Sequence, residues 1–438
     1  MRQLILRFFT ILLVATPFAA VAQTSAYLGM PHDVNGALPR LLSQTGAFKD
    51  MRKLEPAVGL IPYDLVVPFW SDGAAKSRLV AIPQGGKIVF SPDAEWTFPA
   101  GTVFVKTFEL ATDATHPDVK RRLETRLLVR DDNGGVYGVV YRWRPDNSDA
   151  DLVDGSGLTE PVSIHDADGS NHVQTWYYPS RKDCMTCHNS LAGGVLGPKT
   201  RQLNRDLVYA AGVSDNQLHR FNELGLFTSK LTAAQLATLP KLAAADDASR
   251  SLEDKARSYL DANCSHCHRP GGTVANFDAR YQTPLAQQQL IDGEILIDQG
   301  IDRPHVITPH DVWRSIAFMR ISTNGDIRMP PIARQTIDRR GVALLQQWIL
   351  SMPGKEVLAP PQLTPEGGNF TKAVAVVLRS DEAGAEIRYT LDGSTPGPKD
   401  PLYTAPLTIS DATVVRARAY KDGFTRSIVA EAVFTFDK

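Results

Sequence analysis

The chain has 438 residues, of which 43% are hydrophobic, and its formal net charge is −1 at pH 7. At about 150 residues per domain, this length predicts three domains, and the hydrophobic content is sufficient for packed cores. The sequence has no basic patch, so we expect no nucleic-acid partner.

The N-terminus has the three parts of a secretory signal peptide. It reads "MRQLILRFFTILLVATPFAAVAQ", with two early arginines, an apolar run from Phe8 to Val14 and small residues before Gln23. The apolar run is much shorter than the roughly 20 residues of a spanning helix. We therefore expect residues 1–22 to be removed, with no membrane span in the mature protein. This protein would be periplasmic or otherwise exported.

Residues 23–175 are predicted to form a mainly β domain of sandwich or jelly-roll-like type. Short β-prone runs alternate with turn signals, and the runs at 121–130 and 136–143 flank the turn "DDNGG", which predicts a hairpin. Asp64, Asp72 and Lys76 are interpreted as solvated or capping residues rather than an acid/base set.

All four cysteines lie in two copies of one pattern, "CMTCH" from Cys184 and "CSHCH" from Cys264. Disulfides, zinc sites and thiol redox motifs also use close cysteine pairs. However, exported free cysteines usually become disulfides, and zinc does not explain a histidine directly after the second cysteine in both copies.

Covalent haem c explains every position of the repeated pattern. Thiols at i and i+3 lie on one helical turn and can add to the two vinyl groups, while the next histidine binds the iron. The sequence therefore predicts two covalently attached haem c groups. Haem 1 would be held by Cys184, Cys187 and His188, and haem 2 by Cys264, Cys267 and His268.

The distal ligand of haem 1 is left open by the sequence. After the first motif no methionine occurs until Met319, so the options are a histidine, a remote methionine or an open iron. The candidate histidines are His165, His172 and His219, of which His172 is preferred. His266, inside the second motif, is expected at the surface.

Two segments complete the first haem region, residues 176–246. The aromatic run Trp176 to Tyr178 is expected to pack in a core, and a helix is expected to begin at Lys199. The run "W-x-Y-P-S-R-x-D-C-x-x-C-H", followed by "V-L-G-x-x-T-x-Q-L-N", resembles a family of bacterial exported dihaem cytochromes over most of residues 50–353. This resemblance implies a haem-bearing redox protein without indicating a substrate.

The second haem region, residues 247–353, is predicted to be α-helical. Apolar residues recur at helical spacing from Ser249 to Asn263 and from Val342 to Leu350, and Met329 lies between them in the loop "GDIRMPP". A thioether held in this loop would bind the distal side of haem 2 and raise its reduction potential. The order "YLDANCSHCH", "MPP", "LLQQWI" resembles class I cytochrome c domains, which implies a helical fold with one exposed haem edge.

The C-terminal part reads as a separate β domain. A proline-rich linker at 354–368 precedes four predicted strands, at 374–378, 386–390, 414–420 and 428–436, which favour an immunoglobulin-like sandwich over residues 369–438. The segments "IRYTLDGSTP" and "VVRARAYKDG" resemble the C-terminal module of chitobiase and β-hexosaminidase enzymes. The resemblance implies an accessory domain that docks to a polymer or protein, or a spacer, because no paired-carboxylate site accompanies it.

Three functions remain open on the sequence. The preferred one is electron transfer between redox partner proteins, from a dehydrogenase or quinol-side donor to a cytochrome or oxidase, through the two haems. The second is a peroxidase-like enzyme in which haem 1 has an open iron and haem 2 supplies electrons. The third is a redox-sensing or binding protein that uses its β domains.

Overall fold

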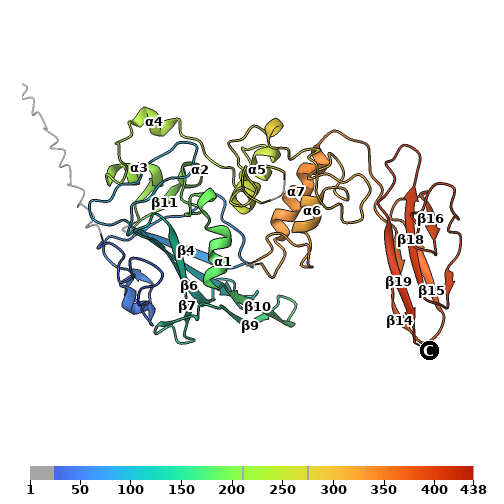
Figure 1. Ribbon diagram of the computed structural model, residues 1–438, viewed down its shortest axis with the longest axis horizontal. Helices are drawn as coiled ribbons and strands as arrows, with labels where there is room; N and C mark the ends of the chain where they lie inside the picture. Colours follow the sequence, from blue (N-terminus) through green and yellow to red (C-terminus); the bar gives the residue numbers. More distant parts are fainter. Residues whose placement is uncertain (1–23, 210–211, 274–275, 333, 438) are drawn as a thin grey trace, which may run out of the picture.

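The computed structural model describes residues 24–209, 212–273, 276–332 and 334–437. The predicted signal peptide lies outside these residues. Three parts follow one another along the molecule (Figure 1): a β-rich part with α1 to α4, a middle part with α5 to α7, and a C-terminal β part. Within the described ranges, none of the helices has the length and apolar character needed to cross a membrane.

The N-terminal part is built on one six-stranded sheet with the order β3-β4-β5-β6-β7-β8, in which every neighbouring pair is antiparallel. The predicted hairpin is confirmed as β6 and β7. The strands are β3 (Ile61–Pro62), β4 (Ala75–Ala81), β5 (Val103–Ala111), β6 (Lys120–Arg130), β7 (Val136–Trp143) and β8 (Ala150–Leu152).

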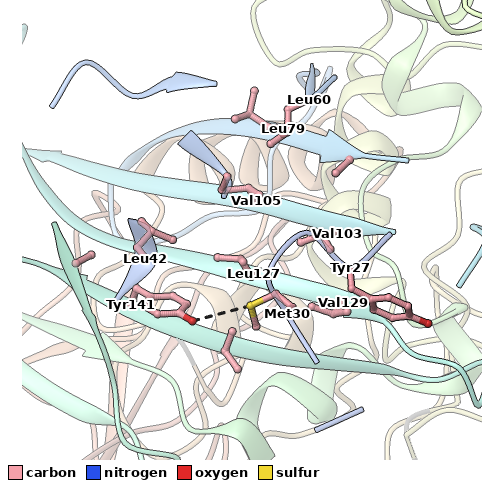
Figure 2. Close-up of a cluster of buried hydrophobic side chains, with 14 of the residues drawn as sticks. Tyr27, Met30, Leu42, Leu60, Leu79, Val103, Val105, Leu127, Val129 and Tyr141 are labelled. Carbon is pink, nitrogen blue, oxygen red and sulfur yellow. Dashed lines mark hydrogen bonds between the residues drawn. The ribbon is translucent and has the colours of Figure 1, made fainter. Parts of the chain in front are cut away.

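One face of this sheet carries the largest apolar core of the N-terminal part (Figure 2). Alternate residues of the strands point into it, such as Leu79, Val105 and Leu127, because successive side chains of a strand face opposite sides. The segment before the sheet closes the core: the Tyr141 hydroxyl donates to the sulfur of Met30 at 4.0 Å.

The opposite face is covered in two places and open between them. The β9–β10 hairpin packs Trp176 against Phe108 of β5, and the α2–α3 region packs Phe221 into the cluster that contains Phe104. The remaining two-stranded elements are hairpins. These strands are β1 (Phe48–Asp50), β2 (Glu55–Pro56), β9 (Leu158–His165), β10 (Asn171–Tyr178), β11 (Asp206–Val208) and β12 (Ser214–Asn216).

The helices are short except for two. The α-helices are α1 (Arg181–Cys187), α2 (Thr200–Leu203), α3 (Gln217–Glu223), α4 (Ala233–Ala237), α5 (Leu252–Cys264), α6 (Ile316–Ile321) and α7 (Arg339–Ser351). The predicted helices of the second haem region are confirmed as α5 and α7, which bury the predicted apolar residues, including Leu260, Leu345 and Trp348, in one cluster.

The prediction of an α-helical cytochrome c-like region is nevertheless wrong. The protein is mostly β, and between α5 and α7 the described chain is irregular apart from the short helix α6 and a single 3-10 turn. Five non-glycine residues in that stretch adopt positive φ, among them Asp292 (52°) and His310 (59°). A left-handed residue interrupts a helix, so the turn-rich sequence here does not sustain further helices. The N-terminal sandwich prediction is also corrected, to one large sheet with flanking hairpins.

The C-terminal part fits the predicted immunoglobulin-like sandwich. Its two sheets have the orders β13-β15-β17 and β14-β19-β18-β16, and they enclose Val376, Ile387 and Phe434. The strands are β13 (Gln362–Thr364), β14 (Gly368–Phe370), β15 (Val374–Arg379), β16 (Glu386–Thr390), β17 (Leu407–Ile409), β18 (Thr413–Tyr420) and β19 (Ala430–Phe436).

Candidate cofactor-binding site

Helix α1 carries the first cysteine motif and lies against the open face of the sheet (Figure 1). The helix begins after Ser180, whose hydroxyl accepts the Asp183 N–H while the Asp183 carboxylate accepts the Ser180 N–H, a capping box. Gly138 of β7 permits the close approach, since a Cβ there would lie 2.9 Å from Cys184 Sγ.

The two motifs share one local backbone arrangement. The His188 N–H donates to the Cys184 carbonyl at 2.9 Å, and the His268 N–H donates to the Cys264 carbonyl at 2.8 Å. Each histidine therefore stands one helical turn beyond the first cysteine of its motif. This is the local geometry that the sequence reading required of both copies.

The His188 ring is prepared to act as a ligand through Nε2. Its Nδ1 lies 2.8 Å from the Gly194 carbonyl oxygen, which can only accept, so Nδ1 carries the proton and Nε2 keeps its lone pair. Burial lowers the pKa of His188 to about 4, and the charges of Lys106 and Arg126 add to the effect. The ring is therefore neutral near pH 7, as an iron ligand must be.

A cavity of about 180 Å³ opens between the sheet, α1 and the C-terminal end of α5. Its lining includes Cys184, Cys187 and His188, together with His266 from the second motif. Five cationic and three acidic side chains belong to this lining: Arg78, Lys106, Arg126, Lys199, Arg269, Glu95, Asp183 and Asp261.

Three of these cations form a row across the sheet. Lys106 of β5 is paired in register with Arg78 of β4 on one side and with Arg126 of β6 on the other. Arg78 has Asp64 at 2.6 Å and Arg126 has Glu124 at 2.5 Å, whereas Lys106 has no carboxylate within ion-pair distance among the described residues. Burial, then Arg78 and Arg126, lower the pKa of Lys106 to about 7.

An anion in the cavity would stabilise the charged form of Lys106, the cation of this row that has no carboxylate partner among the described residues, because like charges directly opposite one another destabilise a sheet. The two propionates of a haem are anions of the required kind. The cationic row, the cysteines on one helical turn and the free Nε2 of His188 together fit a covalently bound haem at the first motif.

The second motif offers a similar but not identical setting. His268 stacks on Phe277 with ring centroids 4.2 Å apart, and its Nδ1 is buried without a hydrogen-bond partner in the described structure. Burial, followed by the charge of Arg320, lowers the pKa of His268 to about 4. In the methionine loop, the Met329 N–H donates to the Arg320 carbonyl at 2.9 Å.

The two motifs, far apart in sequence, are in direct contact. Asn189 Nδ2 donates to the His266 carbonyl at 3.3 Å, and Cys267 Sγ lies 3.9 Å from the Thr186 carbonyl. The loop at 68–74, just before β4, stabilises this arrangement, because the Trp70 N–H donates to Asn263 Oδ1 at 2.8 Å.

Asp72 of the same loop ties it to the chain before α7. Its carboxylate is buried and accepts from the N–H groups of Gln335 and Thr336 at 2.9 and 2.8 Å. Asp72 is therefore neither solvated nor a helix cap, because it is buried and the N–H groups that it accepts precede α7; it joins the N-terminal and middle parts.

The four thiols are not arranged as reactive thiols. None forms a disulfide, and burial raises the pKa of each, to about 12 for Cys187 and Cys264. Catalytic redox cysteines have lowered pKa values, so this environment does not favour a thioredoxin-type role. In the described ranges no three Cys, His, Asp or Glu side chains converge on a metal-ion position; haem c needs none, because the porphyrin supplies most of the iron's ligands.

The histidines predicted upstream lie elsewhere. His172, on β10, is half-exposed with Nδ1 2.6 Å from Asp166 Oδ2, and it does not line the cavity described above. His165 and His219 likewise contact polar neighbours, Asn171 and Asp215, outside the cavity.

His266 shows the reverse outcome. The surface prediction is wrong, because His266 is only 7% exposed and lines the cavity. One signal in the sequence could have predicted this. If Cys264, Cys267 and His268 hold one haem, then His266, which lies between the cysteines on the same turn, must face another way.

Comparison with known proteins identifies the C-terminal module alone. Residues 365–431 match the family model described as chitobiase/beta-hexosaminidase C-terminal domain. No cytochrome c family model matches the chain. No curated protein and no solved structure matches it. The C-terminal module is therefore similar to the C-terminal domain of chitobiase and β-hexosaminidase.

Proposed function

We propose that this chain is an exported dihaem c-type cytochrome, which transfers electrons between redox partner proteins through two covalently bound haems. The observation that carries the proposal is the direct contact between the two Cys-x-x-Cys-His motifs, seen at Asn189 with His266 and at Cys267 with Thr186. Electron tunnelling slows steeply with distance, so adjacent attachment sites suit two successive electron carriers.

Bound haem iron supplies one-electron redox chemistry. The residues of the chain would hold and tune it. His188 and His268 are half-buried and neutral, as the proposed iron ligands should be. Met329 is the proposed distal ligand at the second motif, and Lys106 with its arginine neighbours would offer positive charge to the propionates.

The partners are proposed to be a dehydrogenase or similar donor and a cytochrome or oxidase acceptor. The C-terminal module is a candidate for docking to a protein or polymer, since its family occurs as an accessory domain. Neither role requires nucleic acid or a membrane span in the mature chain.

The test is the haem content of cysteine variants. The protein is expressed with its N-terminal segment in a host that matures c-type cytochromes, and covalent haem is counted by pyridine haemochrome assay and intact mass. We expect two haems per chain for the wild type and one for Cys184→Ala/Cys187→Ala, because each motif binds its haem through its own thioethers.

The matched control is Cys264→Ala/Cys267→Ala, which should also retain one haem but with the optical spectrum of the first site. Wild-type protein purified from this host without covalent haem would contradict the proposal.

A further inference from the structure

We propose that His266, from the second cysteine motif, is the distal iron ligand of the haem held by Cys184, Cys187 and His188. This inference rests on the proposed function, and it names the ligand that the sequence left open. One short turn would then serve both haems, the second through Cys264, Cys267 and His268 and the first through the histidine between them.

The cavity carries the first step of the argument. His266 belongs to its lining together with Cys184, Cys187 and His188, whereas Cys264, Cys267 and His268 do not. His266 is thus part of the cavity at the first motif, whereas the three haem-binding residues of its own motif are not.

The state of the His266 ring is the second step. The residue is only 7% exposed, and the hydrogen bond that it makes to the first motif uses its carbonyl oxygen rather than its ring. Phe69 meets the ring edge-on, with centroids 5.7 Å apart. A neutral imidazole keeps a lone pair on one ring nitrogen, and that lone pair can coordinate iron.

The backbone holds His266 beside the first motif, since the His266 carbonyl accepts from Asn189, the residue that follows His188. The next residue, Cys267, has its Sγ 3.9 Å from the Thr186 carbonyl of that motif.

The competing candidates lack these features. His172 and His219 are half-exposed and hydrogen-bonded to Asp166 and Asp215, and neither they nor Met319 of α6 lines the cavity. A histidine in place of an open site would leave the first iron six-coordinate, which favours electron transfer over reaction with peroxide.

The experiment is low-temperature EPR with optical spectra on the oxidised, haem-loaded full-length protein, after its haem content has been measured. We expect two low-spin ferric signals for the wild type. His266→Ala should lose one of them and gain one equivalent of high-spin haem, and added imidazole should restore the low-spin signal. His172→Ala is the matched control and should keep both low-spin signals.

His266→Met provides a second variant that retains a ligand and most of the buried volume. It should stay low-spin, with the potential of one haem raised, because methionine ligation raises the potential relative to histidine. Two low-spin signals in His266→Ala, or a high-spin haem in the wild type, would overturn the inference while leaving a dihaem protein intact. Fewer than two haems in the wild type would instead count against the proposed function itself.

Discussion

At the scale of single residues, the two histidines proposed as proximal ligands, His188 and His268, differ in what supports their rings. His188 donates from Nδ1 to the Gly194 carbonyl at 2.8 Å, whereas the Nδ1 of His268 has no partner in the described structure and the ring stacks on Phe277. A hydrogen bond at Nδ1 makes Nε2 a stronger donor and stabilises ferric iron. We therefore expect the first haem to have the lower potential, so that electrons run from the first to the second.

Met329 should raise the potential of the second haem further. Met329→Ala is expected to lower one potential by on the order of 100 mV and leave the other nearly unchanged, because thioether ligation favours ferrous iron. A spectroelectrochemical titration resolves the two steps.

Met319→Ala is the control for this substitution, since Met319 lies on α6 and does not line the cavity at the first motif. An unchanged pair of potentials in Met329→Ala would exclude Met329 from the iron.

At the scale of elements, the periodicity of apolar residues correctly predicted the helices and strands that bury one face. The β6–β7 hairpin, α5, α7 and the strands of the C-terminal module follow the expected periodicities. The region between α5 and α7 did not, since its irregular backbone is held by turns and by contacts such as Asp72 with Thr336. Long-range contacts of this kind have no periodic signature, so the likeness of three short segments to a cytochrome c suggested a helical region that the structure lacks.

The close packing of α1 against β7 can be tested by substitution at Gly138. Gly138→Ala should lower the free energy of unfolding by about 1–3 kcal/mol, the usual cost of overpacking, because the added Cβ would lie 2.9 Å from Cys184 Sγ. It should also reduce covalent haem at the first motif, as read by mass spectrometry of the peptide that contains Cys184.

Gly325→Ala is the matched control, because its added Cβ meets only Thr323 Oγ1, at 3.4 Å. Equal haem content and stability in the two glycine variants would show that the close approach of α1 has no role.

At the scale of the whole molecule, one carboxylate joins the C-terminal module to the middle part. Asp302 accepts from Arg314 at 3.1 Å and from Arg418 and Arg426 of the module at 3.1 and 3.0 Å. Burial alone would raise the pKa of Asp302, but the three arginines outweigh it and hold the pKa below its usual range. The module is thus fastened by an ion cluster in addition to the linker.

This cluster makes the fastening pH-dependent. A carboxylate whose pKa is lower in the docked state stabilises docking above its free pKa of about 3.9, and the contribution is lost as the pH falls through the docked value. We expect the module to loosen below about pH 4, seen as larger dimensions in small-angle scattering and faster proteolysis of residues 354–368.

Asp302→Asn should show the loosened state already at pH 7. Its docking free energy should fall by about 1–3 kcal/mol, because the arginines are left without their carboxylate. Asp381→Asn, at an exposed ion pair with Arg379 within the module, should behave like the wild type. Identical scattering of both variants at pH 7 would show that the ion cluster does not hold the module against the middle part.

The sequence by itself determined the local chemistry of this protein. Cysteines at i and i+3 with a histidine at i+4 occupy one helical turn whatever surrounds them, and alternating apolar residues define strands, so the two motifs, the hairpin and the C-terminal sandwich were all readable. Only the tertiary structure decided what the motifs face. The contact of Asn189 with His266, the place of His266 in the cavity lining and the row of Arg78, Lys106 and Arg126 all join segments distant along the chain. Such positions are set by how the sheet, α1 and α5 pack together. Packing between segments that are distant along the chain produces no regular residue spacing, so the sequence cannot predict it.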